Sequence, residues 1–212
     1  MESQPTIKSR TTSRMLALAV AASCVCTAPF AGAAEPVHLL SQNWKQKDWQ
    51  WFYSTTQGSE LLDYAWFRAL ERPRSQTPFL ADSLTRFGYL PNGQNDFNPD
   101  GLPVGFTIDK VGDYKYLGLT CAACHTGQVE FGGTLMQIDG APSRGDLYSF
   151  LVEMRDSLQE TGSDEAKFAR FADKVLGSRD SPGNRRSLRD NLAKYKGRYN
   201  TFIENSPPPT NQ

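Results

Sequence analysis

The chain is poor in the residue types that bind metal ions or cross-link a fold. Of its 212 residues, only four are cysteines and two are histidines. Cys24 and Cys26 lie near the N-terminus, and the other pair is Cys121 and Cys124. A small exported domain held together by disulfides needs more pairs than this. The cysteine count therefore excludes a disulfide scaffold and points to a local role for Cys121 and Cys124.

The chain also lacks a net charge, with 23 basic and 23 acidic residues. Nucleic-acid binding usually needs an excess of positive charge, so we expect no nucleic-acid partner. Hydrophobic residues make up 39% of the chain and charged residues 22%. This composition is typical of a folded globular domain rather than a disordered segment.

The first 33 residues have the pattern of a secretory signal peptide. A basic start is followed by a short apolar run and then by small residues up to Ala33. Export signals have this order, and the apolar run is too short to cross a bilayer. We therefore expect cleavage after Ala33 or Ala34 and a periplasmic or secreted chain without an integral membrane segment. The alternative is a lipid anchor on Cys24.

The motif Cys-Ala-Ala-Cys-His occupies residues 121–125. A structural zinc site needs four ligands, but the chain after cleavage has no further cysteine and only one further histidine, His38. A thioredoxin-like redox pair lies in a βαβ frame, and no alternating pattern of that kind is present. A disulfide between Cys121 and Cys124 would close a very small loop and stabilise little.

Covalent attachment of one haem c is the known meaning of this spacing. Each thiol adds to one vinyl group, and the two vinyl groups lie on neighbouring pyrroles. On a helical turn Cys121 and Cys124 face the same side, so both sulfurs reach one porphyrin edge. His125 then offers its imidazole to the iron. We therefore expect Cys121, Cys124 and His125 to bind the cofactor, with His125 as the metal ligand.

The hydrophobic pattern predicts a mainly α-helical chain. Apolar residues recur at helical spacing in several segments, and Ser143 with Asp146 forms a capping pattern before one of them. The predicted helices cover residues 48–57, 60–71, 147–158, 163–176 and 185–204.

Two segments depart from this helical pattern. Gly132 and Gly133 lie between two short apolar runs, which predicts a β-hairpin over residues 129–140. Residues 73–106 are rich in proline, glycine, asparagine and aspartate, which predicts an irregular loop. A structureless loop of this length is unusual, so the segment is a candidate for lining the haem or a ligand entrance.

Three stretches resemble the N-terminal haem region of rubber-oxygenase-type dihaem cytochromes c, exported proteins related to bacterial cytochrome c peroxidases. They are WFYSTTQGSELLDYAWFRALE, GLPVGFTID and LGLTCAACHTGQVEFGGTLMQIDGAPS, and the likeness runs from about Trp44 to Phe171. The resemblance implies a mainly α-helical, cytochrome c-like fold and redox or oxygen chemistry at haem. It also implies a longer chain with a second C-x-x-C-H, which this sequence does not contain.

The sequence patterns and the resemblance together predict that the chain has four parts. Residues 1–33 are the signal peptide, and residues 34–106 are a helical extension with an irregular loop. Residues 107–204 are a cytochrome c-like haem domain with a short β-hairpin after the motif, and residues 205–212 are a tail.

The function depends on the second axial ligand of the iron, because an iron with one protein ligand is open to O₂ or peroxide. No histidine follows His125, whereas the dihaem peroxidases commonly have a second one a little further along. Met136 in the hairpin and Met154 in the next helix are candidate ligands, and we expect His38 to be a surface residue. The site is therefore either open or closed by one of the two methionines.

Two functions follow from this choice. The first is an exported c-type cytochrome that exchanges electrons with a redox partner protein. The alternative is a haem-dependent oxidoreductase, as the haem domain of an oxygenase or peroxidase, whole or truncated, with an open distal site.

Overall fold

The computed structural model describes residues 37–206, all of which belong to one compact unit. The expected signal peptide and Cys24 lie outside the described residues, as do residues 207–212 of the expected tail. No helix among the described residues is both long enough and apolar enough to cross a membrane.

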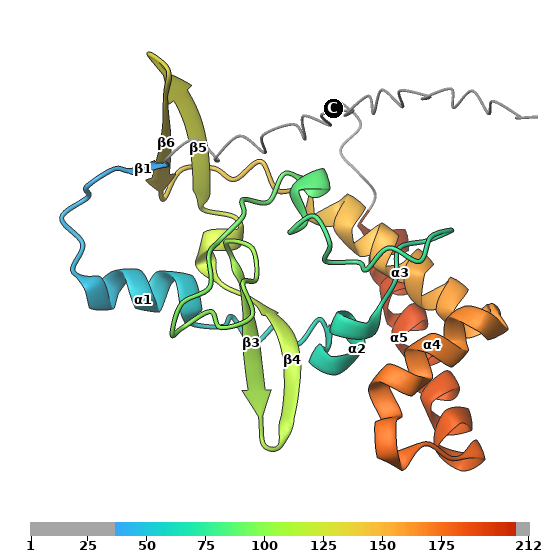
Figure 1. Ribbon diagram of the computed structural model, residues 1–212. Coiled ribbons are helices and arrows are strands. Elements are labelled where there is room, and N and C mark those ends of the chain that lie inside the picture. The colour runs from blue at the N-terminus through green and yellow to red at the C-terminus, as the bar shows by residue number, and fades with distance from the viewer. Residues whose placement is uncertain (1–36, 207–212) are drawn as a thin grey trace, which may run out of the picture. The chain divides into compact units, whose positions relative to one another are not determined.

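The fold is α+β, so the prediction of a mainly α, cytochrome c-like domain is wrong (Figure 1). Of residues 37–206, 45% are helical and 19% are strand, and the strands form two three-stranded sheets. In the described part of the chain, the α-helices are α1 (Gln46–Ser54), α2 (Tyr64–Ala69), α3 (Leu147–Ser163), α4 (Glu165–Leu176) and α5 (Pro182–Asn205).

The first sheet has the strand order β1-β6-β5. The predicted hairpin is confirmed as β5 (Thr126–Phe131) and β6 (Thr134–Asp139), joined by two glycines with positive φ. Positive φ at both turn positions suits the twist of a two-residue hairpin turn. β1 (His38–Leu39) runs parallel to β6 on its other side.

The second sheet was missed by the sequence prediction and has the order β2-β4-β3. β3 (Phe106–Val111) and β4 (Tyr114–Leu119) form a hairpin around Gly112, and β2 (Leu62–Asp63) pairs with β4. These strands contain charged and small residues among the apolar ones, so their alternation is weak. The sheet is stabilised by packing against the helices, which the local pattern does not report.

The predicted helices exist, but α2 is much shorter than expected, and α3 begins at Leu147 as predicted with only one of the two expected capping residues at its start. Residues 60–71 form only the six-residue α2, because Leu62 and Asp63 pair with β4. At α3 the cap is Asp146, whose carboxylate accepts from the backbone N–H of Ser149. Ser143 instead accepts from the N–H of Gly145 outside the helix.

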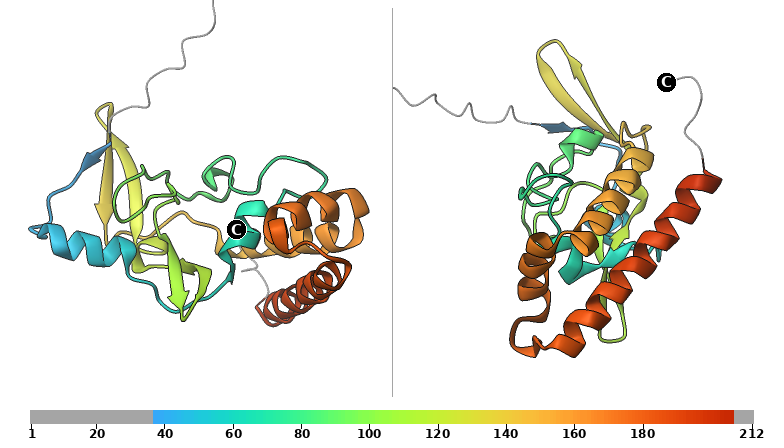
Figure 2. Two further views of the ribbon diagram at one scale, coloured as in Figure 1. Left: turned by 60° about the horizontal axis from the view of Figure 1, so that its bottom comes forward. Right: turned by 90° about the vertical axis from the view of Figure 1, so that its right-hand side faces the viewer.

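The main core lies where α2 and the second sheet meet α3, α4 and α5, which Figures 1 and 2 show packed together. Phe150 is fully buried and contacts the rings of Phe79, Phe87 and Phe106 at centroid distances of 5.5–5.9 Å. A second, smaller core contains Phe52, Val104 and Ala122. This smaller core lies directly under the Cys-Ala-Ala-Cys-His motif.

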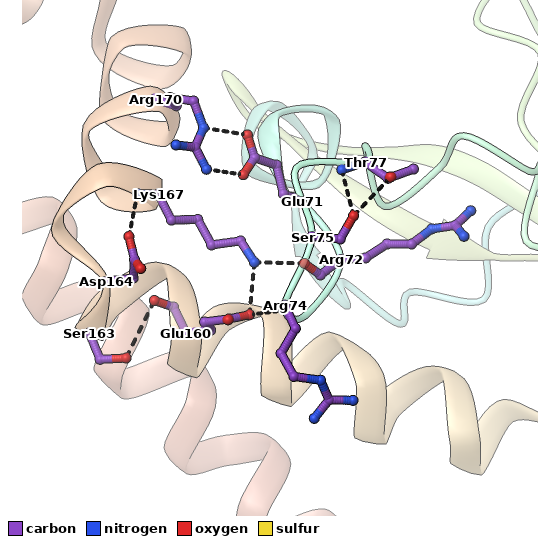
Figure 3. Close-up of polar contacts among 10 residues, drawn as sticks. All are labelled: Glu71, Arg72, Arg74, Ser75, Thr77, Glu160, Ser163, Asp164, Lys167 and Arg170. Carbon is purple, nitrogen blue, oxygen red and sulfur yellow. Dashed lines mark hydrogen bonds and ion pairs between the residues drawn. The ribbon is translucent and has the colours of Figure 1, made fainter.

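Charged side chains tie the loop after α2 to α3 and α4 (Figure 3). Arg170 donates two hydrogen bonds, of 2.9 and 2.7 Å, to the buried carboxylate of Glu71. The buried Nζ of Lys167 donates to the carbonyl oxygen of Arg72 at 2.6 Å and to Glu160 at 2.8 Å. Since a buried charge is costly without partners, these contacts fix the course of the loop.

We expect Lys167→Met to lower the free energy of unfolding at pH 7 by about 2 kcal/mol, the scale of hydrogen bonds to a charged group. The hydrogen bond from Lys167, and then that from the backbone N–H of Arg74, lower the pKa of Glu160. A lowered folded-state pKa means that this stabilisation is present above the unfolded value of about 4.3. It is lost as the pH falls through the folded-state pKa.

Urea unfolding of wild type and Lys167→Met between pH 3 and pH 7 measures this effect. The difference between the two proteins should shrink as the pH falls below the unfolded-state value of about 4.3 and through the lowered folded-state pKa of Glu160. Lys174→Met, on the same helix with its side chain 51% exposed, is the matched control and should change little. A pH-independent difference would contradict the assignment to Glu160.

Candidate functional site

The motif forms a 3₁₀ turn, η2 (Cys121–Ala123), that runs directly into β5. The N–H groups of Cys124 and His125 both donate to the carbonyl oxygen of Cys121, at 3.3 and 3.0 Å. Side chains three positions apart eclipse one another in a 3₁₀ turn, so Cys121 and Cys124 lie on one side. Both thiols are free. Attachment to one porphyrin edge would need both sulfurs on one side, which this turn geometry allows.

The two alanines of the motif point inward, and the reactive residues do not. Ala122 and Ala123 are 1% and 4% exposed, whereas Cys124 and His125 are exposed and Cys121 is half-buried. Ala122 packs in the smaller core with Phe52 and Val104. This inward packing leaves the thiols and the imidazole available at the surface.

Gly105 allows the turn to sit close to the preceding strand. Its φ is +88°, and a Cβ at this position would lie 2.1 Å from the Cα of Ala123. The carbonyl oxygen of Gly105 also accepts from the N–H of Thr120 at 2.9 Å. A side chain here would force η2 away from β3, so glycine is required by both the close approach and the conformation.

The residues after the motif fix its other end. The N–H of Gly140 donates to the carbonyl oxygen of His125 at 2.7 Å, and the N–H of Ser143 donates to that of Cys124 at 3.0 Å. His125 is thus held at the end of the β5–β6 ladder, although its side chain is exposed.

An apolar pocket of about 440 Å³ adjoins the motif. Its lining comes from α1 and the segment before it, from the motif, and from the residue after β6, namely Trp44, Asp48, Trp51, Phe52, Cys121, His125 and Gly140. Trp44 and Trp51 are 38% and 59% exposed, which is unusual for the largest apolar side chain. We call this space the motif pocket.

The motif pocket can take a large, flat, apolar group beside Cys121 and His125, which both line it, whereas Cys124 is exposed and is not a lining residue. Trp44 packs edge-on against Phe52 with ring centroids 5.0 Å apart, which builds an aromatic wall beside Cys121. Exposed aromatic surface in a pocket is stabilised when an apolar ligand covers it. The donor set, with two free thiols, one imidazole and aromatic walls, therefore suits haem c. Residues 37–206 contain no group of three or more His, Cys, Asp or Glu side chains that could hold a metal ion.

Tyr89 is buried, and it lies near enough to Cys124 to feel the charge of that thiol. Burial, and then the charges of Cys124 and Asp146, raise the pKa of the Tyr89 hydroxyl. Tyr89 therefore stays a neutral phenol throughout the physiological range.

None of the three side chains considered as the second iron ligand lines the motif pocket. Met154 is fully buried in the main core, as expected of a core residue. His38 is exposed, and it pairs with the half-buried Met136 across β1 and β6. The carbonyl oxygen of Pro142 lies only 2.8 Å from where a Cβ of Gly127 would be, so residues 141–142 pass over the sheet between Met136 and the motif.

The sequence prediction missed Gly105, Trp44 and Trp51 as parts of the site. A helical wheel of α1 places Asp48, Trp51 and Phe52 on one side, and this signal could have identified a second apolar face. The contact between Gly105 and Ala123 carries no local signal, because it joins residues that are far apart in the sequence.

The chain is similar to Uncharacterized protein y4iJ of Sinorhizobium fredii, with 33% identity over 183 residues. The alignment covers 76% of this chain and 30% of that protein. The chain thus spans less than a third of the relative's length. No protein-family model and no solved structure matches the chain. None of these findings concerns a cofactor, so the resemblance to dihaem cytochromes stays a prediction.

We expect Gly105→Ala to lower the free energy of unfolding by about 2–4 kcal/mol. The new Cβ would clash with the backbone of Ala123, and alanine is also strained at the positive φ of this position. Urea unfolding measures the loss. Gly93→Ala is the matched control: a Cβ there meets nothing within 4 Å, so the change should stay within about 0.5 kcal/mol of wild type. Equal effects of the two variants would contradict the close-packing role of Gly105.

Proposed function

We propose that this chain is an exported redox protein that carries one covalent haem c on Cys121 and Cys124, with His125 as the iron ligand. The observation that carries the proposal is the exposed motif with two free thiols beside an apolar pocket that contains two half-exposed tryptophans. The α+β fold does not weaken it, because attachment depends on the local turn and its pocket.

The residues of the site have separable roles. The inward packing of Ala122 and Ala123 orients the thiols, and the backbone contact from Gly140 orients His125. Trp44 and Trp51 exclude water from the apolar surface they cover. When bound, haem c supplies an iron that accepts and releases single electrons.

Electron transfer with a redox partner protein is the function that this surface position supports best. The motif pocket opens beside Trp51, whose side chain is 59% exposed, so a partner can approach the site directly. Short distances between redox centres favour electron exchange, and no substrate pathway through the protein is needed.

A second candidate function rests on the composition of the motif pocket. The described residues that line it include no methionine and no histidine besides His125. An iron with one protein ligand is open to O₂ or peroxide. This favours the alternative of a haem domain with oxygenase or peroxidase chemistry.

We expect the haem to stay on the polypeptide after denaturation and acid-acetone extraction. Serine at both Cys121 and Cys124 should abolish this retention, because no thioether can form. His125→Ala should keep the thiols but yield poorly ordered haem or fail to mature. Haem staining of denatured protein, produced in a host that matures c-type cytochromes, measures the retention.

Cys24→Ser is the matched control for the loss of a cysteine and should retain haem. Mass spectrometry of the same preparation should find Ala34 or Glu35 at the N-terminus. A colourless wild-type chain after extraction would refute the proposed attachment, and a lipid-bearing Cys24 would place the protein at a membrane surface instead.

We expect the reduced haem protein to bind carbon monoxide readily and the oxidised protein to lack the weak far-red band of a Met–iron bond. The physical reason is that neither Met136 nor Met154 lines the motif pocket. Optical spectra with and without carbon monoxide measure both properties.

Met136→Ala should leave the spectra unchanged, and the more conservative Met136→Leu is its control for packing. If the band is present in wild type and vanishes in both variants, Met136 is the second ligand. The open-site function would then be wrong, and electron transfer alone would stand.

A further inference from the structure

A second cavity, of about 580 Å³, lies on the other face of α1. Gln46, Trp49, Gln50 and Tyr53 recur at the spacing of one helix face and line it. The side chains of α1 that line the motif pocket belong to the opposite face. We call this space the second cavity; the first sheet and the loop of residues 91–98 provide its other walls.

The sheet wall is a chain of hydrogen-bonded side chains that begins with two neutral amides and a phenol and ends on the carboxylate of Asp139. The side-chain amide of Gln128 donates to the side-chain oxygen Oε1 of Gln137 at 3.2 Å, and the Nε2 of Gln137 donates to the hydroxyl of Tyr53 at 2.7 Å. Tyr53 in turn donates to the buried carboxylate of Asp139. Burial, and then the contact with Asp139, raise the pKa of Tyr53, so its hydroxyl stays neutral. Each amide is thus held in place with hydrogen-bonding capacity left over.

The loop wall presents an aromatic ring. Phe97 is 56% exposed, and its loop is held by asparagine side chains rather than by a helix or sheet. Asn95 accepts from the N–H of Phe97 at 2.9 Å, and Asn98 both donates to and accepts from the backbone of Leu102, at 2.8 and 2.9 Å. The loop therefore places an apolar ring at one wall of the cavity, whereas the sheet presents polar amides at another.

The lining contains no permanent positive charge. Among the described residues that line the second cavity there is no lysine, arginine or histidine, and the single carboxylate is Asp96. A phosphate or carboxylate ligand would have no cation to pair with. A purely apolar ligand would cover the amide groups and leave their hydrogen bonds unmade, which is costly.

We propose that the second cavity binds a neutral, hydroxyl-rich ligand of the carbohydrate class. Sugar hydroxyls both donate and accept, as the amides of Gln46, Gln50 and Gln128 do. The C–H faces of a sugar ring pack against aromatic rings such as Trp49 and Phe97. The volume lies within the range of ligand sites in proteins. This binding is independent of the haem, since a different face of α1 forms the cavity.

Isothermal titration of the full chain with glucose, N-acetylglucosamine and maltose tests this proposal. We expect saturable binding of at least one of the three sugars, with a dissociation constant in about the millimolar range or below. Glucose 6-phosphate is the charged comparator and should bind more weakly than glucose, because Asp96 repels it.

Trp49→Ala and Phe97→Ala should each weaken sugar binding at least about tenfold, through loss of the stacking surface. Phe97 is exposed, so its variant tests the cavity even if Trp49→Ala fails to fold. Tyr114→Ala is the matched aromatic control, since Tyr114 is 65% exposed at the turn between β3 and β4, away from the lining residues.

Three results would overturn the proposal. They are no saturable binding of any neutral sugar, binding that Phe97→Ala leaves unchanged, and tighter binding of glucose 6-phosphate than of glucose. Haem retention is read from a separate measurement, so failure here leaves the proposed redox function standing.

Discussion

The close approach of Gly105 to Ala123 is the contact on which the rest of the site depends. It lets the two alanines of the motif pack inward against β3 and the smaller core. Because the alanines face inward, the 3₁₀ turn presents both thiols and the imidazole at the surface. A larger residue at Gly105 or Ala123 would displace this turn, and the turn carries all three reactive side chains.

Helix α1 contacts the motif turn through one face and the first sheet through the other. It has only nine residues, and both of its faces line a cavity. One face brings Trp51 and Phe52 to the motif, and Phe52 also packs against Ala122 in the smaller core. The other face meets the first sheet through Tyr53, Gln137 and Asp139. Two cavities with different linings therefore share one short helix.

Helices α3 and α4 support β3, the strand that begins next to the motif. Buried ion pairs hold the loop after α2 to α3 and α4, and the aromatic cluster around Phe150 joins these helices to β3. β3 begins at Phe106, immediately after Gly105. The position of the motif is thus set by packing that starts far from it.

The sequence alone identified the motif and most of the helices, because residue spacing and apolar periodicity are local properties. The hairpin after the motif was also predictable, since Gly132 and Gly133 mark its turn. Only the tertiary structure decided the fold class: β3 and β4 have weak alternation and are stabilised by their contacts with distant helices. The same holds for the motif pocket, whose walls come from α1 and η2, about 70 residues apart. Local patterns contain no information about which distant surfaces come into contact. The contact between α1 and η2 is what places two tryptophans beside Cys121 and His125.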